Sequence, residues 1–135
     1  MIQAERLAAL HASSFAGPSR WSADAFAEAL VDPRCFFVRE EAEEDGFALG
    51  RQVVDEAELL TLIVASAKRE AGLGRRLLAA FEREARKRGA AFAFLEVSAD
   101  NLIARRLYDA AGWTIAGHRS GYYAGIDAVT MRKVL

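Results

Sequence analysis

The sequence predicts a three-layer α/β/α sandwich (an α+β fold) built on one mixed, mostly antiparallel sheet. Before residue 64, short apolar stretches are separated by tight turns, as in an antiparallel meander. Beyond it, an apolar strand, a glycine turn, a long amphipathic helix and a second apolar strand follow one another. This second pattern is that of a central β-α-β crossover. Together the two patterns predict a mixed sheet with helices on both faces.

The first half of the chain is predicted to hold two helices and three strands. Ser22 is a candidate N-cap, because its hydroxyl can accept from a free N–H of the first turn. Asp32-Pro33 is expected to end that helix, since the residue before proline disfavours the helical conformation. The acidic stretch 40–46 is expected to be a solvated hairpin loop. The predicted elements are helices at 2–12 and from Ser22 to Asp32, and strands at 35–39, 47–54 and 58–64.

A glycine turn in the middle of the chain is the predicted ligand site. The apolar run LLTLIV at 59–64 is typical of a buried strand, and REAGLG at 69–74 follows it. Gly72 and Gly74 lack a Cβ, so a ligand can lie close to their backbone. The following helix offers free N–H groups and the positive end of its dipole, which favour an anion such as a pyrophosphate. This helix is expected to bury Leu73, Leu77, Leu78, Phe81 and Ala85 and to end at Gly89.

The last third of the chain is predicted to complete the sheet. The segment AFAFLEVS at 91–98 is nearly continuously apolar, as expected for a central strand. Asp100 is a candidate cap for the next helix, which Gly112 is expected to end. Two final strands are predicted at 113–118 and 127–134, joined through 120–125.

Length and composition favour one cytoplasmic domain spanning residues 1–135. The net charge of −1 disfavours a protein that chiefly grips nucleic acid, for which a strongly basic face is expected. Charge is uneven, however: residues 68–88 hold eight basic and three acidic side chains, around the proposed anion site. Cys35 is the single cysteine, so no internal disulfide is possible and a reducing compartment is expected. No signal peptide or membrane span is expected, because no apolar run is long enough.

The glycine turn and the segments around it carry a resemblance to a known family. Residues 69–74 fit the spacing Q/R-x-x-G-x-G/A between a strand and a helix. The other segments are EAELLTLIV (56–64), LEVSADN (95–101), ARRLYDAAGW (104–113), GYY (121–123), HASSFAGPSRWS (11–22) and DAVTMR (127–132). Together they resemble the GNAT superfamily of acetyl-CoA-dependent N-acetyltransferases, over essentially the whole chain. They are most similar to its RimI-type branch, the ribosomal-protein-alanine N-acetyltransferases.

The resemblance implies the GNAT fold, with the β-α-β unit binding acyl-CoA and acetyl-CoA as co-substrate. The backbone of the third strand would bind the pantetheine arm, and the glycine turn would hold the pyrophosphate. Asn101 would contact the cofactor; its alternative role is that of a helix cap, and the two roles are compatible. Glu70 departs from the pattern, because a negative charge is unfavourable beside a pyrophosphate. The implied cofactor residues are Leu62, Ile63, Val64, Arg69, Glu70, Ala71, Gly72, Leu73, Gly74, Arg75 and Asn101.

Two side chains are candidates for the proton transfers that acetylation of an amine requires. The amine must lose a proton before it attacks the thioester, and the departing sulfur benefits from a proton donor. Glu96 interrupts an apolar strand and is expected on the face of Phe92, Phe94 and Ser98; a carboxylate there needs a partner or water. The alternative is a structural acid that bonds a neighbouring strand. Tyr108 is the acid that the resemblance implies, with simple core packing as its alternative.

The acceptor class is the least constrained inference. The branch resemblance implies a protein N-terminal amine, such as that of a ribosomal protein, with Tyr122 and Tyr123 lining the acceptor cleft. The alternatives are a lysine side chain, a small amine, or a non-catalytic acyl-CoA-binding protein. His11 and His118 lack ligand spacing, so no metal site is predicted, and no nucleic-acid or membrane partner is expected.

Overall fold

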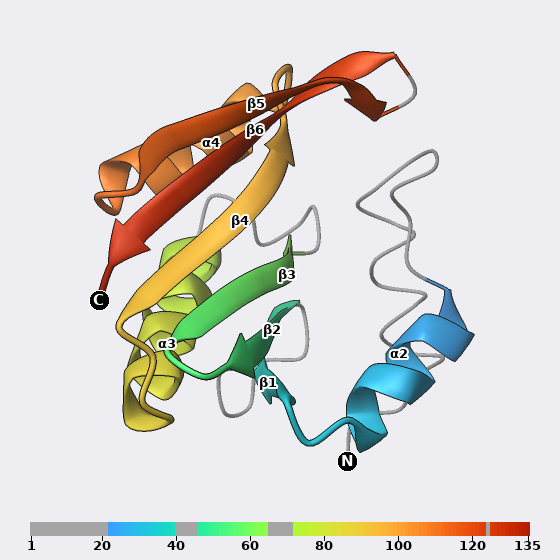
Figure 1. The fold of residues 1–135 in the computed structure, drawn as a ribbon, viewed down its shortest axis with the longest axis vertical. Helices are drawn as coiled ribbons and strands as arrows, with labels where there is room; N and C mark the ends of the chain where they lie inside the picture. Colours follow the sequence, from blue (N-terminus) through green and yellow to red (C-terminus); the bar gives the residue numbers. More distant parts are fainter. Residues whose placement is uncertain (1–21, 40–45, 65–71, 124) are drawn as a thin grey trace.

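The computed structural model describes residues 22–39, 46–64, 72–123 and 125–135 (Figure 1). The helix predicted at 2–12 therefore lies outside the described residues. Elsewhere the predicted order of elements is confirmed. The elements are α2 (Ala23–Val31), β1 (Cys35–Val38), β2 (Gly46–Val53), β3 (Glu56–Val64), α3 (Leu73–Lys87), β4 (Phe92–Ser98), α4 (Leu102–Ala110), β5 (Thr114–Tyr123) and β6 (Ile126–Val134).

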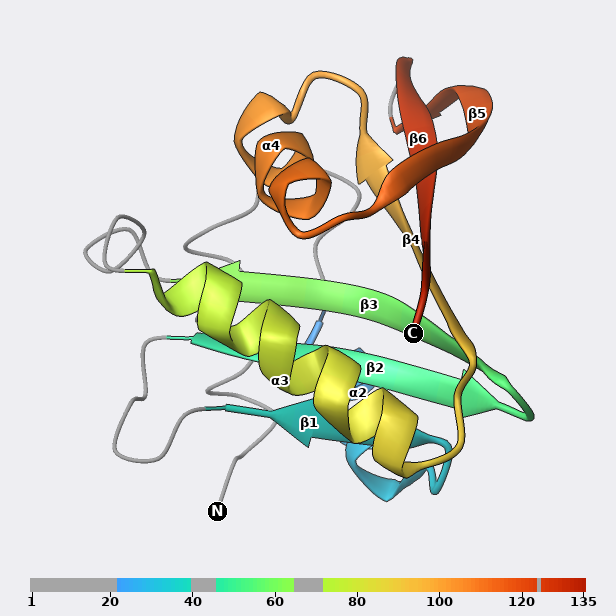
Figure 2. The same ribbon diagram turned by 90° about the vertical axis from the view of Figure 1, so that its left-hand side faces the viewer.

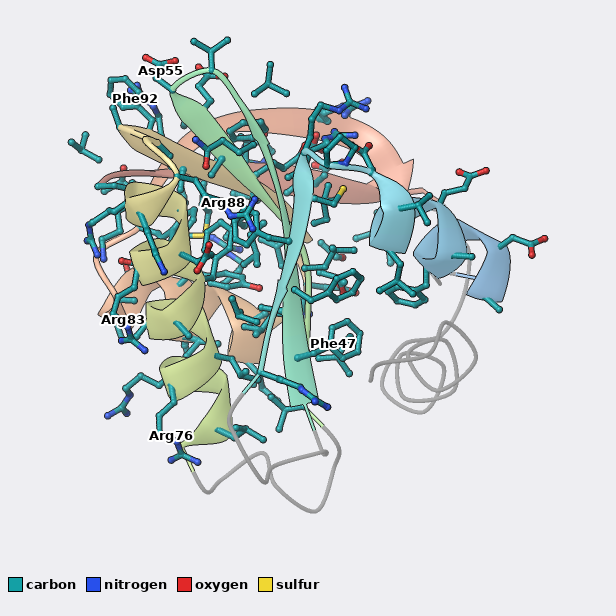
Figure 3. The ribbon with its side chains drawn as sticks, turned by 90° about the horizontal axis from the view of Figure 1, so that it is seen from below. Phe47, Asp55, Arg76, Arg83, Arg88 and Phe92 are labelled. Atoms are coloured by element: carbon teal, nitrogen blue, oxygen red, sulfur yellow. The ribbon has the colours of Figure 1, made fainter. Side chains whose placement is uncertain are left out.

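The described strands form one six-stranded sheet in the order β1-β2-β3-β4-β6-β5. Only the β3–β4 pair is parallel among them, and the other four pairs are antiparallel. Helix α2 lies on one side of β1–β3 and α3 on the other, with Phe47 on the α2 side (Figure 3). The predicted three-layer sandwich with a mixed, mostly antiparallel sheet is confirmed.

Helix ends follow local capping chemistry. The Ser22 hydroxyl accepts from the Ala25 N–H at 3.1 Å, which confirms the predicted N-cap of α2. Gly89 has φ +97° directly after α3, as the left-handed residue that ends a helix commonly does. The expected cap at Asp100 is wrong: Asn101 caps α4 through the Ala104 N–H, and Asp100 instead accepts from the Ser98 hydroxyl.

Two apolar clusters lie on the two faces of the sheet. The cluster under α3 and α4 is the larger and includes Ala93, Leu95 and Val97 of β4. Of the residues predicted to be buried on α3, it includes Leu78, Phe81 and Ala85 but not Leu73 and Leu77. Those two leucines are nevertheless buried, so the predicted buried face of α3 is confirmed. The smaller cluster lies under α2 and consists of Phe26, Ala29, Phe47, Leu49 and Ile63.

A buried polar network ties α3 to the far half of the sheet. Glu82 is 5% exposed, and its Oε2 accepts from the Trp113 Nε1–H at 3.2 Å. Its Oε1 accepts from Lys133 Nζ at 2.6 Å, and Lys133 also donates to the Ala111 carbonyl at 2.7 Å. Helix α3, the end of α4 and strand β6 therefore meet at one carboxylate.

Strand β5 is longer than predicted. It was expected to end at residue 118, but it runs to Tyr123, which pairs with Ile126. Gly121 has φ +63°, and its N–H donates to Asp127 Oδ1 at 3.0 Å, so the ladder continues through an irregular segment. Among the helices of the described ranges, none has the length and apolar character needed to span a membrane.

Candidate active site

The sheet opens between its two central strands. Strands β3 and β4 pair only at Glu56–Phe92, Ala57–Ala93 and Glu58–Phe94. Figure 2 shows the strands diverging from this common start, with β4 carrying β6, β5 and α4 away from β3. Beyond Glu58, the edge of β3 that faces β4 has no paired strand among the described residues. Backbone N–H and C=O groups along this edge are available to an extended ligand.

Strand β3 carries an extra residue within this opening. Across β2, Leu59 is level with Gly50 and Thr61 with Leu49, so Leu60 is the additional residue of a β-bulge. A bulge changes the direction of side chains and interrupts regular pairing, and bulges are frequent beside functional sites. Leu62 and Val64, which the resemblance implies as cofactor contacts, lie beyond the bulge on the diverging part of β3.

The N-terminus of α3 lies at the end of β3. Gly72 is the N-cap of the helix, with φ +80°, and as a glycine it has no side chain with which to cap the first turn. A Cβ at Gly74 would lie 3.5 Å from Leu107 of α4 and 3.7 Å from Val64, so the helix begins between β3 and α4. Its first N–H groups and the exposed Arg75 and Arg76 offer positive charge there. Figure 3 shows Arg76 at this end of the helix. Arg69, Glu70 and Ala71 lie outside the described residues.

Glu96 is half-buried on β4 and is held by an arginine. The burial of β4 alternates, which confirms that Glu96 shares a face with Phe92, Phe94 and Ser98. This face is opposite the larger cluster, on the α2 side of the sheet. Arg119 of β5 donates to Glu96 Oε1 at 2.8 Å. The other oxygen, Oε2, is buried without a hydrogen-bond partner in the described part of the chain.

Tyr108 and Asn101 both belong to α4. Tyr108 is 7% exposed and lies in the larger cluster, with its ring 6.1 Å from that of Trp113. It therefore approaches the sheet from the face opposite Glu96. Asn101 Oδ1 is engaged in capping α4, which confirms its structural role, and its role toward the cofactor stays a prediction.

Sequence reasoning missed Thr61, a buried polar side chain on the same face of the sheet as Glu96. Thr61 is 7% exposed, and its Oγ1 has no hydrogen-bond partner within the described ranges. A lone threonine in an apolar strand signals high β propensity rather than function, so the sequence held no cue. Tyr122 and Tyr123 lie at the end of β5, and their side chains are outside the description.

The described residues contain neither an activated cysteine nor a cluster of metal-ligating side chains. Burial raises the pKa of the Cys35 thiol, which keeps the sulfur protonated and weakly nucleophilic. Within residues 22–39, 46–64, 72–123 and 125–135, no three His, Cys, Asp or Glu side chains are grouped to hold a metal ion.

The chain is similar to acetyltransferases over most of its length. Residues 4–113 match the family described as "Acetyltransferase (GNAT) family". The chain is 37% identical over 138 residues to the N-alpha-acetyltransferase RimI of Mycobacterium tuberculosis, covering 96% of this chain and 85% of that protein. It is 35% identical over 121 residues to the [Ribosomal protein bS18]-alanine N-acetyltransferase of Escherichia coli, covering 89% and 82%.

The fold agrees with these relationships. The crystal structure of the ribosomal-protein-S18-alanine N-acetyltransferase from Escherichia coli matches with a TM-score of 0.86 at 31% identity. The match covers 97% of this chain and 86% of that one. The chain therefore belongs to the GNAT family of acetyltransferases, which use acetyl-CoA, and it is an N-acetyltransferase.

Proposed function

We propose that the chain transfers the acetyl group of acetyl-CoA to the N-terminal α-amine of a protein, by direct attack of the amine. The observation that carries the proposal is Glu96, a carboxylate beside the opening of the sheet with one oxygen unpaired and buried. Similarity to enzymes named for N-terminal and alanine acetylation supports a protein N-terminus, such as that of a ribosomal protein, as acceptor. We propose a cytoplasmic site of action, because one cysteine allows no internal disulfide.

The residues around the opening fit the co-substrate. The unpaired edge of β3 suits the amide-bearing pantetheine arm, with Leu62, Ile63 and Val64 supplying backbone groups. The N-terminus of α3 suits the pyrophosphate, with Gly72, Leu73, Gly74 and Arg75 at its first turn. When bound, acetyl-CoA supplies the acetyl thioester. Arg69, Glu70, Ala71 and Asn101 complete the set that we propose by resemblance.

The proposed chemistry divides two proton transfers between opposite faces of the sheet. Glu96 takes one proton from the acceptor ammonium, and the neutral nitrogen then forms a C–N bond as the C–S bond breaks. Tyr108 donates its phenolic proton to the departing sulfur and recovers a proton from the amide nitrogen. Glu96 finally releases its proton to solvent, so that one amide, one thiol and one proton result. Positioned proton transfer of this kind contributes about 10²–10⁴ in rate.

An acyl-enzyme is not part of the proposal. Cys35 is the only thiol of the chain, it lies on β1 beside the smaller cluster, and its pKa is raised by burial. A protonated thiol on the far edge of the sheet is a poor nucleophile for a thioester at the β3–β4 opening.

Thiol release from acetyl-CoA tests the proposal. The acceptor panel comprises a peptide with a free N-terminal alanine, an N-terminally blocked peptide with an internal lysine, and a polyamine. We expect release with the alanyl peptide. Tyr108→Phe should lower kcat about 100-fold with the affinity for CoA nearly unchanged. Glu84→Gln, on the exposed side of α3, is the matched control with unchanged kcat.

Each alternative has its own result. Release with the lysine peptide or the polyamine alone would replace the proposed acceptor class. Binding of CoA without release for any acceptor would identify a non-catalytic acyl-CoA-binding protein. An unchanged kcat for Tyr108→Phe would remove Tyr108 from the proton transfer.

A further inference from the structure

Two buried oxygens without partners lie on the strands that flank the opening. Among the described residues, unpartnered buried side-chain oxygens are found at three positions: Gln52, Thr61 and Glu96. Gln52 is explained by its amide nitrogen, which donates to the Arg88 carbonyl at 2.6 Å beyond the end of α3. Thr61 Oγ1 and Glu96 Oε2 have no comparable structural explanation, and leaving such groups unpaired is costly.

Thr61 and Glu96 face the same side of the sheet. Thr61 is two positions from Ile63 and therefore shares its face, and Ile63 belongs to the smaller cluster under α2. Thr61 also pairs with Leu49 of β2, which belongs to the same cluster. Glu96 lies between Leu95 and Val97, which face the larger cluster, so its own side chain faces the other side of the sheet. Both side chains therefore lie on the α2 face of the sheet.

The bulge determines which residue of β3 corresponds to Glu96. The last aligned pair is Glu58–Phe94, so two further residues along each strand would bring Leu60 level with Glu96. The additional residue in β3 places Leu60 and Thr61 together opposite Leu49. Counted along each strand from the Glu58–Phe94 pair, Thr61 is therefore the residue of β3 that corresponds to Glu96, although the two strands do not pair there.

Arg119 determines which carboxylate oxygen remains available. Its guanidinium occupies Glu96 Oε1 at 2.8 Å, which leaves Oε2 as the acceptor without a partner. Thr61 Oγ1 is a second acceptor, because a hydroxyl oxygen carries two lone pairs. Two acceptors facing one opening suit a ligand with at least two N–H donors on one small group.

We propose that Thr61 Oγ1 and Glu96 Oε2 together bind the primary amine of the acceptor, so that Thr61 is a substrate-contact residue of this enzyme. The inference rests on the proposed function and deepens it. Glu96 takes a proton from the ammonium, while Thr61 accepts a hydrogen bond from a second N–H. This second bond keeps the nitrogen in place while its freed electron pair turns from the carboxylate toward the thioester carbon.

The test compares Thr61→Val, which is similar in shape but lacks the hydroxyl, with Thr61→Ser, which retains it. With the alanyl peptide, we expect Thr61→Val to lower kcat/KM about 10- to 100-fold, the range of one hydrogen bond to a charged group. Thr61→Ser should stay within about threefold. The Tm of Thr61→Val should be equal or higher by about 3 °C, because the change removes an unpartnered buried hydroxyl.

Thr114→Val is the matched control. Thr114 lies on β5, is exposed, and donates to the Arg132 carbonyl at 3.4 Å. Loss of the Thr114 hydroxyl should leave kcat/KM and the affinity for CoA unchanged. The affinity of Thr61→Val for CoA should also be unchanged, because the proposal assigns Thr61 to the amine.

A binding measurement separates this inference from the proposed function. Calorimetric titration of the alanyl peptide into the chain saturated with CoA probes the amine site without turnover. Weaker binding by Thr61→Val supports the inference even if the wild type shows no thiol release, an outcome that would overturn the proposed function alone. Equal binding and equal kcat/KM for wild type and Thr61→Val would overturn the inference. Absence of both peptide binding and turnover in the wild type would overturn both.

Discussion

The carboxylate of Glu82 is the point at which stability can be tested most sharply. Its side chain is 7% exposed and accepts hydrogen bonds from Trp113, which directly precedes β5, and from Lys133 of β6. Glu82→Ala removes both hydrogen bonds. It leaves the indole N–H of Trp113, a residue that is 1% exposed, and part of the Lys133 ammonium without acceptors. Removing one partner of a buried ion pair costs about 3–5 kcal/mol.

That cost is large compared with the stability of a domain of this size. Typical free energies of unfolding are about 5–15 kcal/mol, so Glu82→Ala should remove at least about a fifth of the total. The corresponding fall in Tm is roughly 10–20 °C. Urea unfolding followed by far-ultraviolet circular dichroism measures the change, without relying on the fluorescence of the perturbed Trp113.

Glu84 provides the matched control on the same helix. It pairs with Arg88 at 2.8 Å, but both side chains are about one-third exposed. Because exposed pairs contribute little, Glu84→Ala should cost under about 1 kcal/mol, and the gain in helix propensity is the same in both variants. A double variant, Glu82→Leu with Lys133→Met, should recover most of the loss by replacing the ion pair with apolar packing. Equal losses for Glu82→Ala and Glu84→Ala would refute the assignment of stability to the buried network.

Three further outcomes are expected. Gly50→Ala should destabilise by about 1–3 kcal/mol in urea, because a Cβ there would lie 2.5 Å from the ring of Phe36, whereas Gly117→Ala meets only ordinary contacts at 3.8 Å. Asn101→Ala should lower the free energy of unfolding by about 1 kcal/mol, because the cap of α4 is lost, whereas Asn101→Ser retains a capping side chain. If the serine variant keeps its stability but binds CoA more weakly, Asn101 contacts the cofactor. Because burial raises the pKa of Cys35, the folded thiol keeps its proton at a pH where the unfolded thiol loses it. Stability should therefore fall at alkaline pH, and alkylation should be slower than in urea-unfolded chain, with equal rates contradicting the burial.

The features that the sequence predicted correctly depend on neighbours close in the chain. The Ser22 cap, the stop at Gly89 and the buried stripe of α3 each follow from residues within one or two helical turns. The exposed side of α3 behaves likewise, and Figure 3 shows Arg83 on its outer surface. These features could be predicted because local chemistry decides them.

The features that were missed depend on residues distant in the chain. Arg119 reaches Glu96 from 23 positions away, and no local pattern announces that pairing. The bulge at Leu60 exists only as a mismatch between β3 and β2, so Thr61 could not be distinguished from the apolar residues beside it. The extension of β5 to Tyr123 depends on Asp127 of the next strand. Asp100 and Asn101 are both good caps, and only the backbone geometry decides between them.

The opening between β3 and β4 has a consequence for how this family varies in sequence. A strand edge that binds its ligand through main-chain groups presents the same N–H donors and C=O acceptors whichever apolar side chains it carries. Substitutions along such a strand are then limited by packing alone, and they can accumulate while the recognition surface is preserved. The side chains that vary least among relatives should be those whose own polar atoms contact the ligand. Glu96 and Thr61 are the positions that test this expectation most directly.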